Sequence, residues 1–169
     1  AASVGEYGAA FGANTEAGFA GAAFGDGTTA GDSGAAFGAG TMAGIAGAAF
    51  GANTAAGNYG AAFGFTTVAG DSGAAFGYGT TAENYGAAFG YGTTAGFAGA
   101  AFGVDTTAGD WGFSAGRAAK GALGSFVFAD NSTGGTPFNR TNIPNSFSLR
   151  AAGGIYAEIG TNVFAVSNS

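Results

Sequence analysis

The five residues Gly-Ala-Ala-Phe-Gly recur every thirteen positions over most of the chain. The copies begin at Gly8, Gly21, Gly34, Gly47, Gly60, Gly73, Gly86 and Gly99. A period this strict over about a hundred residues predicts one small structural unit stacked on copies of itself. Stacking of this kind produces a rod, and rods are built to extend, present or assemble rather than to catalyse.

Each unit is numbered here from the glycine that opens the motif. Two or three glycines per unit, and the absence of a helical period, exclude a repeating helix. We expect two short strands, at positions 2–4 and 8–10, separated by two tight corners. The register persists in residues 112–116 and 125–129, so the sequence predicts an all-β fold over residues 1–129. This fold is a parallel β-roll or solenoid of about ten 13-residue coils, on the order of 50 Å long.

Two columns of residues are expected to form the core of this rod. Position 4 is phenylalanine and position 8 is threonine in eight successive units, and position 10 is alanine. Because positions 2 and 4 share one face of a strand, and 8 and 10 share one face of the other, we expect phenylalanine to point inward, facing threonine across a thin interior. The predicted core ladder consists of Phe11, Phe24, Phe37, Phe50, Phe63, Phe76, Phe89, Phe102, Thr15, Thr28, Thr41, Thr54, Thr67, Thr80, Thr93 and Thr106.

The corners are marked by residues that tolerate the left-handed region of backbone conformation. Position 7 is mostly glycine, asparagine or aspartate, which indicates φ > 0 there. The predicted turn residues are Asn14, Gly27, Gly40, Asn53, Gly79 and Gly92. Thr66 is the exception and predicts a locally altered turn. Position 11 is glycine except at Glu83, which marks a second corner.

Positions 12 and 13 compensate for each other in size. A large apolar residue at position 12 is followed by alanine, whereas a polar residue at position 12 is followed by tyrosine, tryptophan or serine. This exchange suggests that the corner contacts something close by, such as a neighbouring chain. The exposed aromatic residues Tyr59, Tyr78, Tyr85, Tyr91 and Trp111 are candidates for receptor or glycan contact, or for packing between chains.

Composition excludes several classes of function. The chain has no cysteine and no histidine, which excludes disulfides, ordinary zinc sites and imidazole catalysis. The acidic residues stand singly at corners, so we expect no enzyme activity, no metal and no cofactor. Residues 1–116 hold eight acids and no base, which argues against binding to nucleic acid. No apolar run is long enough for a membrane span, and we expect no membrane insertion.

A coil this thin is expected to depend on sister chains. Each unit offers one large apolar side chain and few charges, so a single rod would expose apolar stripes. Several rods packed side by side would cover them. We therefore expect an obligate homo-oligomer.

The repeat resembles the head repeats of YadA-like trimeric autotransporter adhesins. Gly73-Ala-Ala-Phe-Gly-Tyr-Gly-Thr-Thr-Ala82 follows the pattern of that family, with phenylalanine where isoleucine is usual and thirteen residues where fourteen are typical. The resemblance covers residues 3–129. It implies a left-handed parallel β-roll in a homotrimer.

The remainder of the chain is similar to a module of phage tail fibres. The similarity lies in residues 112–129 and in Asn145-Ser-Phe-Ser-Leu-Arg-Ala-Ala-Gly-Gly-Ile155. In such fibres the module often precedes an endosialidase-type intramolecular chaperone, which trimerises the fibre and then cleaves itself off. The resemblance implies Ser169 as a candidate maturation cleavage end; an arbitrary boundary at this residue is the alternative.

Residues 130–169 are expected to form a loop and short strands that close the trimer as a small β-rich cap. Asn131 to Pro144 holds both prolines and several turn formers, and is predicted to be a loop. Alternation at Phe147, Leu149 and Ala151 predicts a strand, and residues 155–159 and 163–166 predict two more.

Three functions compete on these observations. The first is a structural and host-attachment segment of a phage tail fibre, a rigid homotrimeric rod that presents a surface to a cell-surface receptor or glycan. The second is the head of a bacterial trimeric surface adhesin. Both imply an extracellular location, on a virion or on a bacterial cell surface. The third is an ice-binding β-solenoid, suggested by the regular threonine column.

Overall fold

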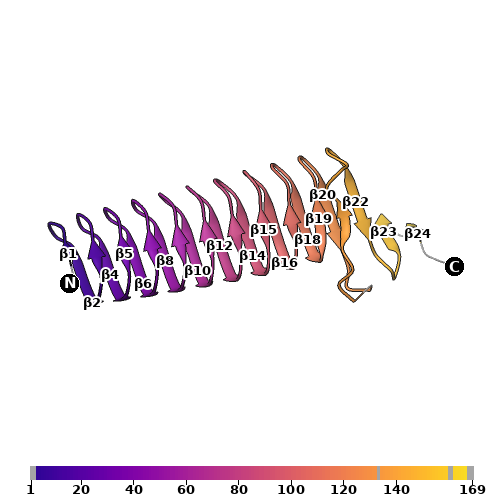
Figure 1. Cartoon of the computed structure of the whole chain (residues 1–169). Coiled ribbons are helices and arrows are strands. Elements are labelled where there is room, and N and C mark those ends of the chain that lie inside the picture. The colour runs from indigo at the N-terminus through magenta and orange to yellow at the C-terminus, as the bar shows by residue number, and fades with distance from the viewer. Residues whose placement is uncertain (1–2, 133, 160–161, 167–169) are drawn as a thin grey trace.

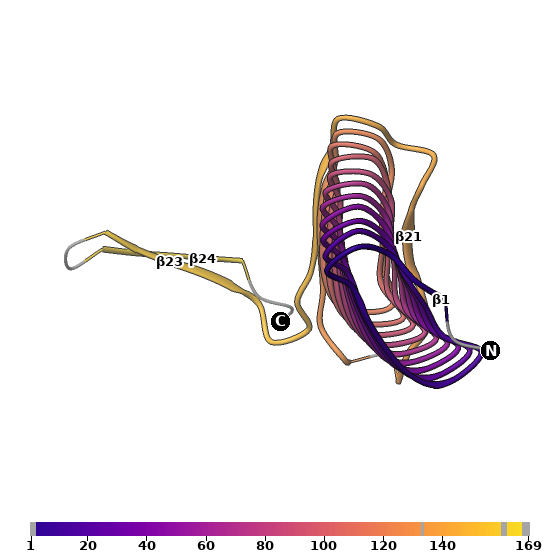
Figure 2. The ribbon, with the colours of Figure 1, turned by 90° about the vertical axis from the view of Figure 1, so that its left-hand side faces the viewer.

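The protein is a parallel β-solenoid of about ten coils stacked along one straight axis, as Figure 1 shows. This computed structural model describes residues 3–132, 134–159 and 162–166. Viewed along the axis, each coil is thin and flattened (Figure 2). The predicted all-β solenoid with a thirteen-residue repeat is confirmed. The described residues contain no helix, and so none that could cross a membrane.

One long strand per coil forms the first sheet, called the long-strand sheet below. It spans positions 2–6 in most coils, two residues more than expected. Its strands are β2 (Ala9–Ala13), β4 (Ala22–Asp26), β6 (Ala35–Ala39), β8 (Ala48–Ala52), β10 (Ala61–Phe65), β12 (Ala74–Tyr78), β14 (Ala87–Tyr91), β16 (Ala100–Val104), β18 (Phe113–Arg117), β20 (Phe126–Ala129) and β22 (Phe147–Arg150).

One short strand per coil forms the second sheet, the short-strand sheet. It covers positions 9 and 10 in most coils, one residue less than expected. Its strands are β1 (Ser3–Val4), β3 (Glu16–Ala17), β5 (Thr29–Ala30), β7 (Met42–Ala43), β9 (Ala55–Ala56), β11 (Val68–Ala69), β13 (Thr81–Ala82), β15 (Thr94–Ala95), β17 (Thr107–Ala108), β19 (Ala119–Gly121) and β21 (Phe138–Arg140).

Neighbouring coils are in register by one whole repeat. Phe63 lies opposite Phe50 on one side and opposite Phe76 on the other. The corners continue this pairing, because the N–H of Gly27 donates to the carbonyl of Ala13 at 2.9 Å and the N–H of Ala20 donates to that of Glu6 at 2.9 Å. Each residue type therefore forms a column along the rod.

Both corners require a residue in the left-handed region. The predicted turn residues all have positive φ, between 52° and 62°: Asn14, Gly27, Gly40, Asn53, Gly79 and Gly92. Thr66 has φ 53° like the others, so the altered turn expected there is wrong. Position 13 was not expected to share this conformation, yet Tyr59, Ser72 and Ala98 have φ between 50° and 56°. Backbone hydrogen bonds to the adjacent coil hold these residues in the left-handed conformation despite the strain that this conformation imposes on residues with a side chain.

The interior holds small side chains, and the inward orientation expected for phenylalanine is wrong. The buried columns are alanine at position 3, threonine at position 8 and alanine at position 10, as in Ala62, Thr67 and Ala69. The threonine half of the predicted core ladder is confirmed: Thr15, Thr28, Thr41, Thr54, Thr67, Thr80, Thr93 and Thr106 are buried. The phenylalanine half lies on the outer face: Phe11, Phe24, Phe37, Phe50, Phe63, Phe76, Phe89 and Phe102 are exposed or half-buried.

The reason for the difference is the width of the coil. The prediction placed positions 2 and 4 inside, and the structure places position 3 inside, a shift of one residue that turns every side chain to the other face. Two sheets joined by such short corners leave room between them for about three small side chains per coil. Alanine and threonine fill that space to normal interior density, whereas a phenyl ring would force the sheets apart.

Glycine at position 5 is required by the approach of the next coil. Nine successive glycines from Gly12 to Gly116 have φ between 104° and 135°. A Cβ atom built on any of them would lie 1.6–2.0 Å from the carbonyl oxygen of the residue one coil further on. No L-residue with a side chain can occupy this column without separating the coils.

The last coils change the packing of the interior. Position 3 becomes Ser114 and then Val127, the largest fully buried side chain. Gly121 lies opposite, where a Cβ atom would be 3.2 Å from Cγ2 of Val127. The same Cβ atom would lie 2.7 Å from Oγ of Ser114, so the missing methyl group at Gly121 makes room for both Ser114 and Val127.

The C-terminal segment adds two strands, β21 and β22, to the solenoid before the chain leaves the rod. Strand β21 lies inside the segment expected to be a loop and pairs with β19, while β22 pairs with β20 as a further coil. The strands expected at residues 147–151, 155–159 and 163–166 are confirmed as β22, β23 (Ile155–Ile159) and β24 (Asn162–Val166). β23 and β24 form an antiparallel hairpin that projects from the rod (Figure 2). The candidate cleavage end Ser169 lies outside the described residues.

We predict that the substitution Gly64→Ala destabilises the rod by on the order of 4 kcal/mol or more, because the new Cβ atom would lie 1.8 Å from the carbonyl oxygen of Gly77. Thermal and denaturant unfolding followed by circular dichroism measures the loss. Gly79→Asn is the matched control. Nothing lies within 4 Å of a Cβ atom there, and position 7 accepts asparagine elsewhere, so its cost should stay near 1 kcal/mol. Equal losses in the two variants would contradict the steric explanation.

The buried threonine hydroxyls generate a second prediction. The Oγ1 atom of Thr67 is buried without a hydrogen-bond partner. Thr67→Val keeps the shape and removes the unpaired hydroxyl, so the free energy of unfolding should rise by about 1 kcal/mol. Thr67→Ser keeps the hydroxyl and removes a buried methyl group, which should cost about 1 kcal/mol. Denaturant unfolding compares the two, and a stability order of serine above valine would overturn the prediction.

Candidate functional site

The outer face of the long-strand sheet carries a continuous column of phenylalanine rings. From Phe24 to Phe89, consecutive ring centroids lie 4.8–4.9 Å apart and the rings are nearly parallel. Phe11 at the end of the column is 62% exposed, whereas the rings between neighbours are half-buried because stacking covers both of their faces. The strand pairing sets this spacing, so the column is a consequence of the register.

The column continues into the last coils on a neighbouring position. Phe102 contacts Phe113, a position 2 residue, with ring centroids 5.7 Å apart. Phe113 stacks on Phe126 at 4.9 Å and Phe126 stacks on Phe147 at 5.1 Å. The aromatic column therefore runs from β2 to β22.

A second, shorter stack lies beside it at position 6. Phe65 stacks on Tyr78 at 5.2 Å, and Tyr78 stacks on Tyr91 at 5.1 Å. Within the fully described strands β2 to β16, Asp26 is the one charged residue of this sheet. The outer face of the long-strand sheet is thus a flat surface of alanine, glycine and aromatic rings, which we call the phenylalanine face.

The second corner carries aromatic residues in a different arrangement. Phe97, at position 12, meets Tyr85 of the preceding coil and Trp111 of the following coil edge to face, with centroids 5.5 and 5.7 Å apart. Tyr7 and Phe19 form a similar pair at 5.6 Å. These contacts within one chain account for the size compensation between positions 12 and 13. The neighbouring chain inferred from it is not required.

The polar residues at position 12 cap the backbone of the preceding coil. The Oδ1 atom of Asp71 accepts the N–H of Asn58 at 2.8 Å, and Oδ1 of Asn84 accepts the N–H of Asp71 at 2.9 Å. Asp32, Asn58 and Asp110 make the same bond to Phe19, Ile45 and Phe97. Two acids never follow each other in this column, because like charges one coil apart would repel.

The sequence grouped five aromatic residues as contact candidates, and the structure divides them into two sets. Tyr78 and Tyr91 belong to the stack on the phenylalanine face, where rings cover both faces of Tyr78 and one face of Tyr91, and they are 51% and 53% exposed. Tyr59, Tyr85 and Trp111 lie at the corner and are 70%, 63% and 62% exposed. The second set recurs every twenty-six residues, on alternate coils; this spacing is visible in the sequence, but it does not by itself reveal how exposed each ring is. Phe97 and Asn84 were not expected to belong to this surface.

A shallow pocket of about 330 Å³ lies beside these corner residues. Its lining includes Val68, Thr81, Glu83, Asn84 and Phe97. Glu83 stands where other units have glycine. The lining therefore combines apolar side chains with one carboxylate, one amide and one hydroxyl.

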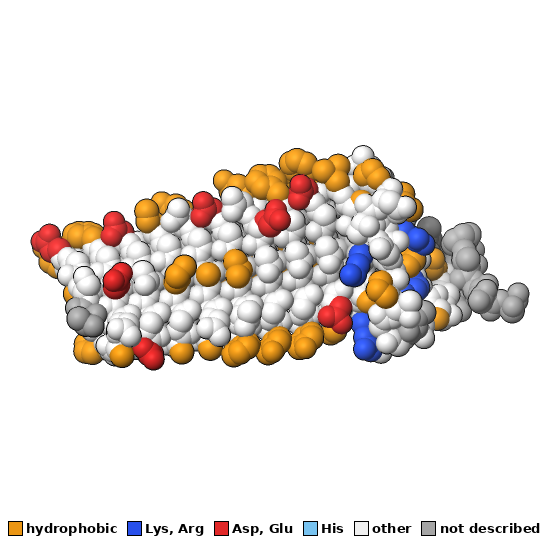
Figure 3. Space-filling view, in the orientation of Figure 1, with side chains coloured by type: hydrophobic (Ala, Val, Ile, Leu, Met, Phe, Trp, Pro, Cys, Tyr) orange, Lys and Arg blue, Asp and Glu red, His pale blue; other side chains and the backbone are white. Residues whose placement is uncertain are grey.

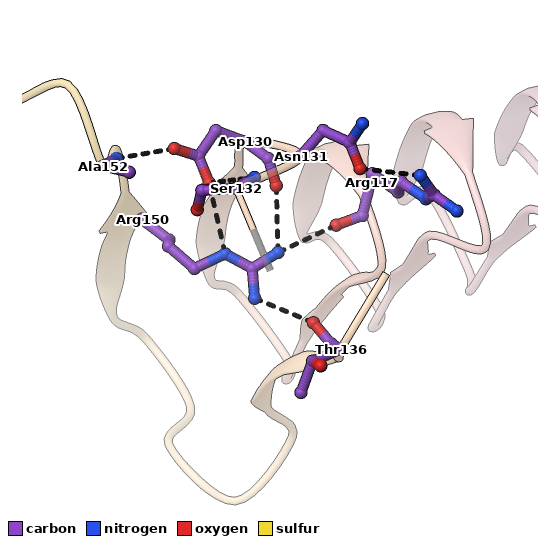
Figure 4. Close-up of polar contacts among 7 residues, drawn as sticks. All are labelled: Arg117, Asp130, Asn131, Ser132, Thr136, Arg150 and Ala152. Carbon is purple, nitrogen blue, oxygen red and sulfur yellow. Dashed lines mark hydrogen bonds and ion pairs between the residues drawn. The ribbon is translucent and has the colours of Figure 1, made fainter. Parts of the chain in front are cut away.

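The charges are separated along the rod. Figure 3 shows acids scattered over the solenoid and lysine and arginine gathered at its C-terminal end. Arg150 forms an ion pair with Asp130, because its Nε lies 3.5 Å from Oδ1 of that residue. The guanidinium of Arg150 also donates to the carbonyls of Thr136 and Asp130 at 2.8 and 3.0 Å (Figure 4). These contacts hold the excursion between β20 and β22 against the end of the solenoid.

Asp130 is the acceptor at the centre of this network. The hydroxyl of Ser132 and the backbone N–H of Ala152 donate to its carboxylate, and together with Arg150 they lower its pKa below the ordinary 3.8. The ionised form is thereby favoured at neutral pH. Among the described residues, no three acids gather as metal ligands. The contacts of Asp130 with Ser132, Ala152 and Arg150 are thus explained by their role in holding the C-terminal segment.

No protein-family model matches the chain, and no curated protein is significantly similar to it. The resemblance to adhesin heads and tail-fibre modules stays a prediction.

The capping column generates a prediction about charge. Asn84→Asp places a second carboxylate one coil from Asp71 while keeping an Oδ1 acceptor for the N–H of that residue. Repulsion between the two should lower the free energy of unfolding at pH 7 by about 1 kcal/mol. Lowering the pH until one of the two carboxyl groups is protonated should recover the lost free energy of unfolding, because the uncharged carboxyl does not repel its neighbour.

The matched control is Asn53→Asp, at a corner whose column neighbours, Gly40 and Thr66, carry no charge. Urea unfolding across a pH series measures both variants. The same pH dependence in the two would show that the position of Asn84 is not special.

Proposed function

We propose that this chain is a structural and host-attachment segment of an extracellular fibre, in which three copies pack side by side as a rigid rod. The supporting observation is the phenylalanine face. Ten coils at about 4.8 Å, each with a five-residue strand of about 3.3 Å per residue, give this face an area of roughly 700–800 Å². The largest apolar patch on a typical monomer is about 300–600 Å².

The size and chemistry of the face suit a sister chain. A stable interface buries about 800 Å² on each partner. Two copies share the same repeat, so their aromatic columns match coil by coil along their whole length. The acids lie mainly on other surfaces, where they would keep the assembled rod soluble. The threefold number follows from the resemblance to trimeric adhesin heads and tail fibres.

Attachment is assigned to the surfaces that the bundle would leave free. A stiff rod that repeats the same side chains presents many weak contacts at once, and multivalency turns these into firm binding. The head of a bacterial trimeric adhesin is the alternative, and it would use the same geometry. The threonine column that suggested ice binding is buried, so it cannot contact ice.

We predict that the chain elutes with three times its mass of 15.9 kDa in size-exclusion chromatography with light scattering. Phe50→Glu combined with Phe76→Glu, two coils apart, should break the assembly into single chains, because charges would have to be buried at the interface. Met42→Glu combined with Val68→Glu is the matched control, since both residues lie exposed on the short-strand sheet. It should leave the assembly intact.

Circular dichroism of both variants checks that the coils stay folded. A folded wild-type monomer would overturn the assembly, and a dimer would keep the phenylalanine face as the interface but overturn the threefold number. Attachment is tested separately on a glycan array, where wild-type rods should be retained. Failure to bind any glycan there would contradict glycan-mediated attachment.

A further inference from the structure

We infer that Tyr59, Tyr85 and Trp111 form a binding row for an extended, uncharged β-1,4-linked glycan, with the pocket at Glu83 and Phe97 as a side site for a sugar substituent. This inference rests on the proposed attachment function and names the class of ligand and the surface that holds it. We call these three residues the corner row.

The corner row differs from the stacks on the phenylalanine face in the spacing of its rings. In the stacks every coil contributes a ring, so each ring covers the faces of its neighbours. In the corner row the intervening coils contribute Ser72 and Ala98. Within this column no ring is therefore followed by another ring in the next coil, and between Tyr85 and Trp111 the position 12 ring of Phe97 lies edge to face with both. All three residues are among the most exposed large apolar side chains that the structure describes.

The geometry of the row follows from the register. All three residues occupy position 13, with φ of 56°, 61° and 51°, and each donates its backbone N–H to the residue at position 12 of the preceding coil. They thus lie on one line along the rod. Each of the three residues lies two repeats from the next, with one coil between them, which corresponds to about 10 Å along the rod.

This spacing fits a particular kind of polymer. Successive sugars in an extended β-1,4-linked chain are flipped, so every second sugar presents the same face, at a distance close to two coils of the rod. The C–H groups on that face pack against the electron-rich face of an aromatic ring. Three rings on one line would therefore contact the first, third and fifth sugars of one chain.

Polar groups lie along the same line. Asn58, Asp71, Asn84 and Asp110 occupy position 12 beside the row, and each uses one side-chain oxygen for the backbone. The second polar atom of each side chain points away from that bond and can meet sugar hydroxyls. The acids among them, with Glu83, disfavour an anionic chain.

The pocket gives the row a preferred position for a substituent. Phe97 contacts both Tyr85 and Trp111 and also lines the pocket. Among its lining residues, Val68 suits a methyl group and the Asn84 amide suits a carbonyl. An N-acetyl group combines both, which favours N-acetylated sugars over plain ones.

The test uses the assembled full chain and four soluble probes: N-acetylchitohexaose, cellohexaose, N-acetylchitobiose and hexameric β-1,4-mannuronate. Titration calorimetry should show binding of the two uncharged hexamers, with N-acetylchitohexaose tighter. The disaccharide should bind at least tenfold more weakly because it reaches one ring, and the mannuronate should not bind. Tyr85→Ala and Trp111→Ala should each weaken hexamer binding by roughly tenfold.

Two matched controls separate stacking on a spaced row from general adhesion to aromatic surfaces. Tyr78→Ala combined with Tyr91→Ala removes two rings from the phenylalanine face and should leave affinity within about twofold. Ser72→Tyr combined with Ala98→Tyr adds rings at the same left-handed corner that already accepts tyrosine in Tyr85. The added rings would close the row to one per coil, so affinity should fall although the aromatic area rises.

The outcomes distinguish the site from the function. Hexamer binding that survives Tyr85→Ala and Trp111→Ala, or that increases with Ser72→Tyr and Ala98→Tyr, overturns the corner row while attachment elsewhere stands. Wild-type rods that bind other glycans on the array but neither uncharged hexamer overturn the ligand class alone. Rods that bind no glycan at all overturn glycan-mediated attachment together with this inference.

Discussion

The close approach of successive coils at position 5 is the constraint on which the rest of the structure depends. A Cβ atom on the glycine at this position would overlap the carbonyl oxygen of the residue one coil further on. This contact, repeated from Gly12 to Gly116, keeps strand pairing uninterrupted from β2 to β22. The short corners, in turn, keep the coil narrow, so the interior accepts alanine and threonine and excludes rings.

The aromatic surface follows directly from that narrow interior. Rings that cannot enter the core must lie outside, and the register then aligns them at the spacing of the strands. Where every coil contributes a ring, the rings bury each other's faces and produce the phenylalanine face. Where alternate coils contribute one, as at Tyr59, Tyr85 and Trp111, the rings of that column do not stack on one another, and Phe97 of the neighbouring column meets two of them edge to face. One architecture thus yields a surface suited to a sister chain and another suited to a separate ligand.

Stacking also imposes a rule on charge. Any residue type repeated at one position forms a column, so an acid repeated in adjacent coils would face its own copy. The position 12 column avoids this by placing asparagine on both sides of Asp71, which preserves the backbone cap without adding charge. The basic residues stand apart at the C-terminal end, where Arg150 pairs with Asp130 and ties the last excursion to the solenoid.

The sequence by itself determined the period, the parallel solenoid, the buried threonine column and the left-handed corner at position 7. Each of these depends on local preferences or on exact repetition, which a single chain reveals. It did not determine which face of the long strand points inward, because Ala62 and Phe63 are adjacent and both are compatible with a strand. It also did not separate Tyr85 from Tyr91 as surface types, since ring exposure depends on the neighbouring coils. The tertiary structure decided both, because the distance between the two sheets sets the size of side chain that the core accepts, and the register sets which rings cover one another.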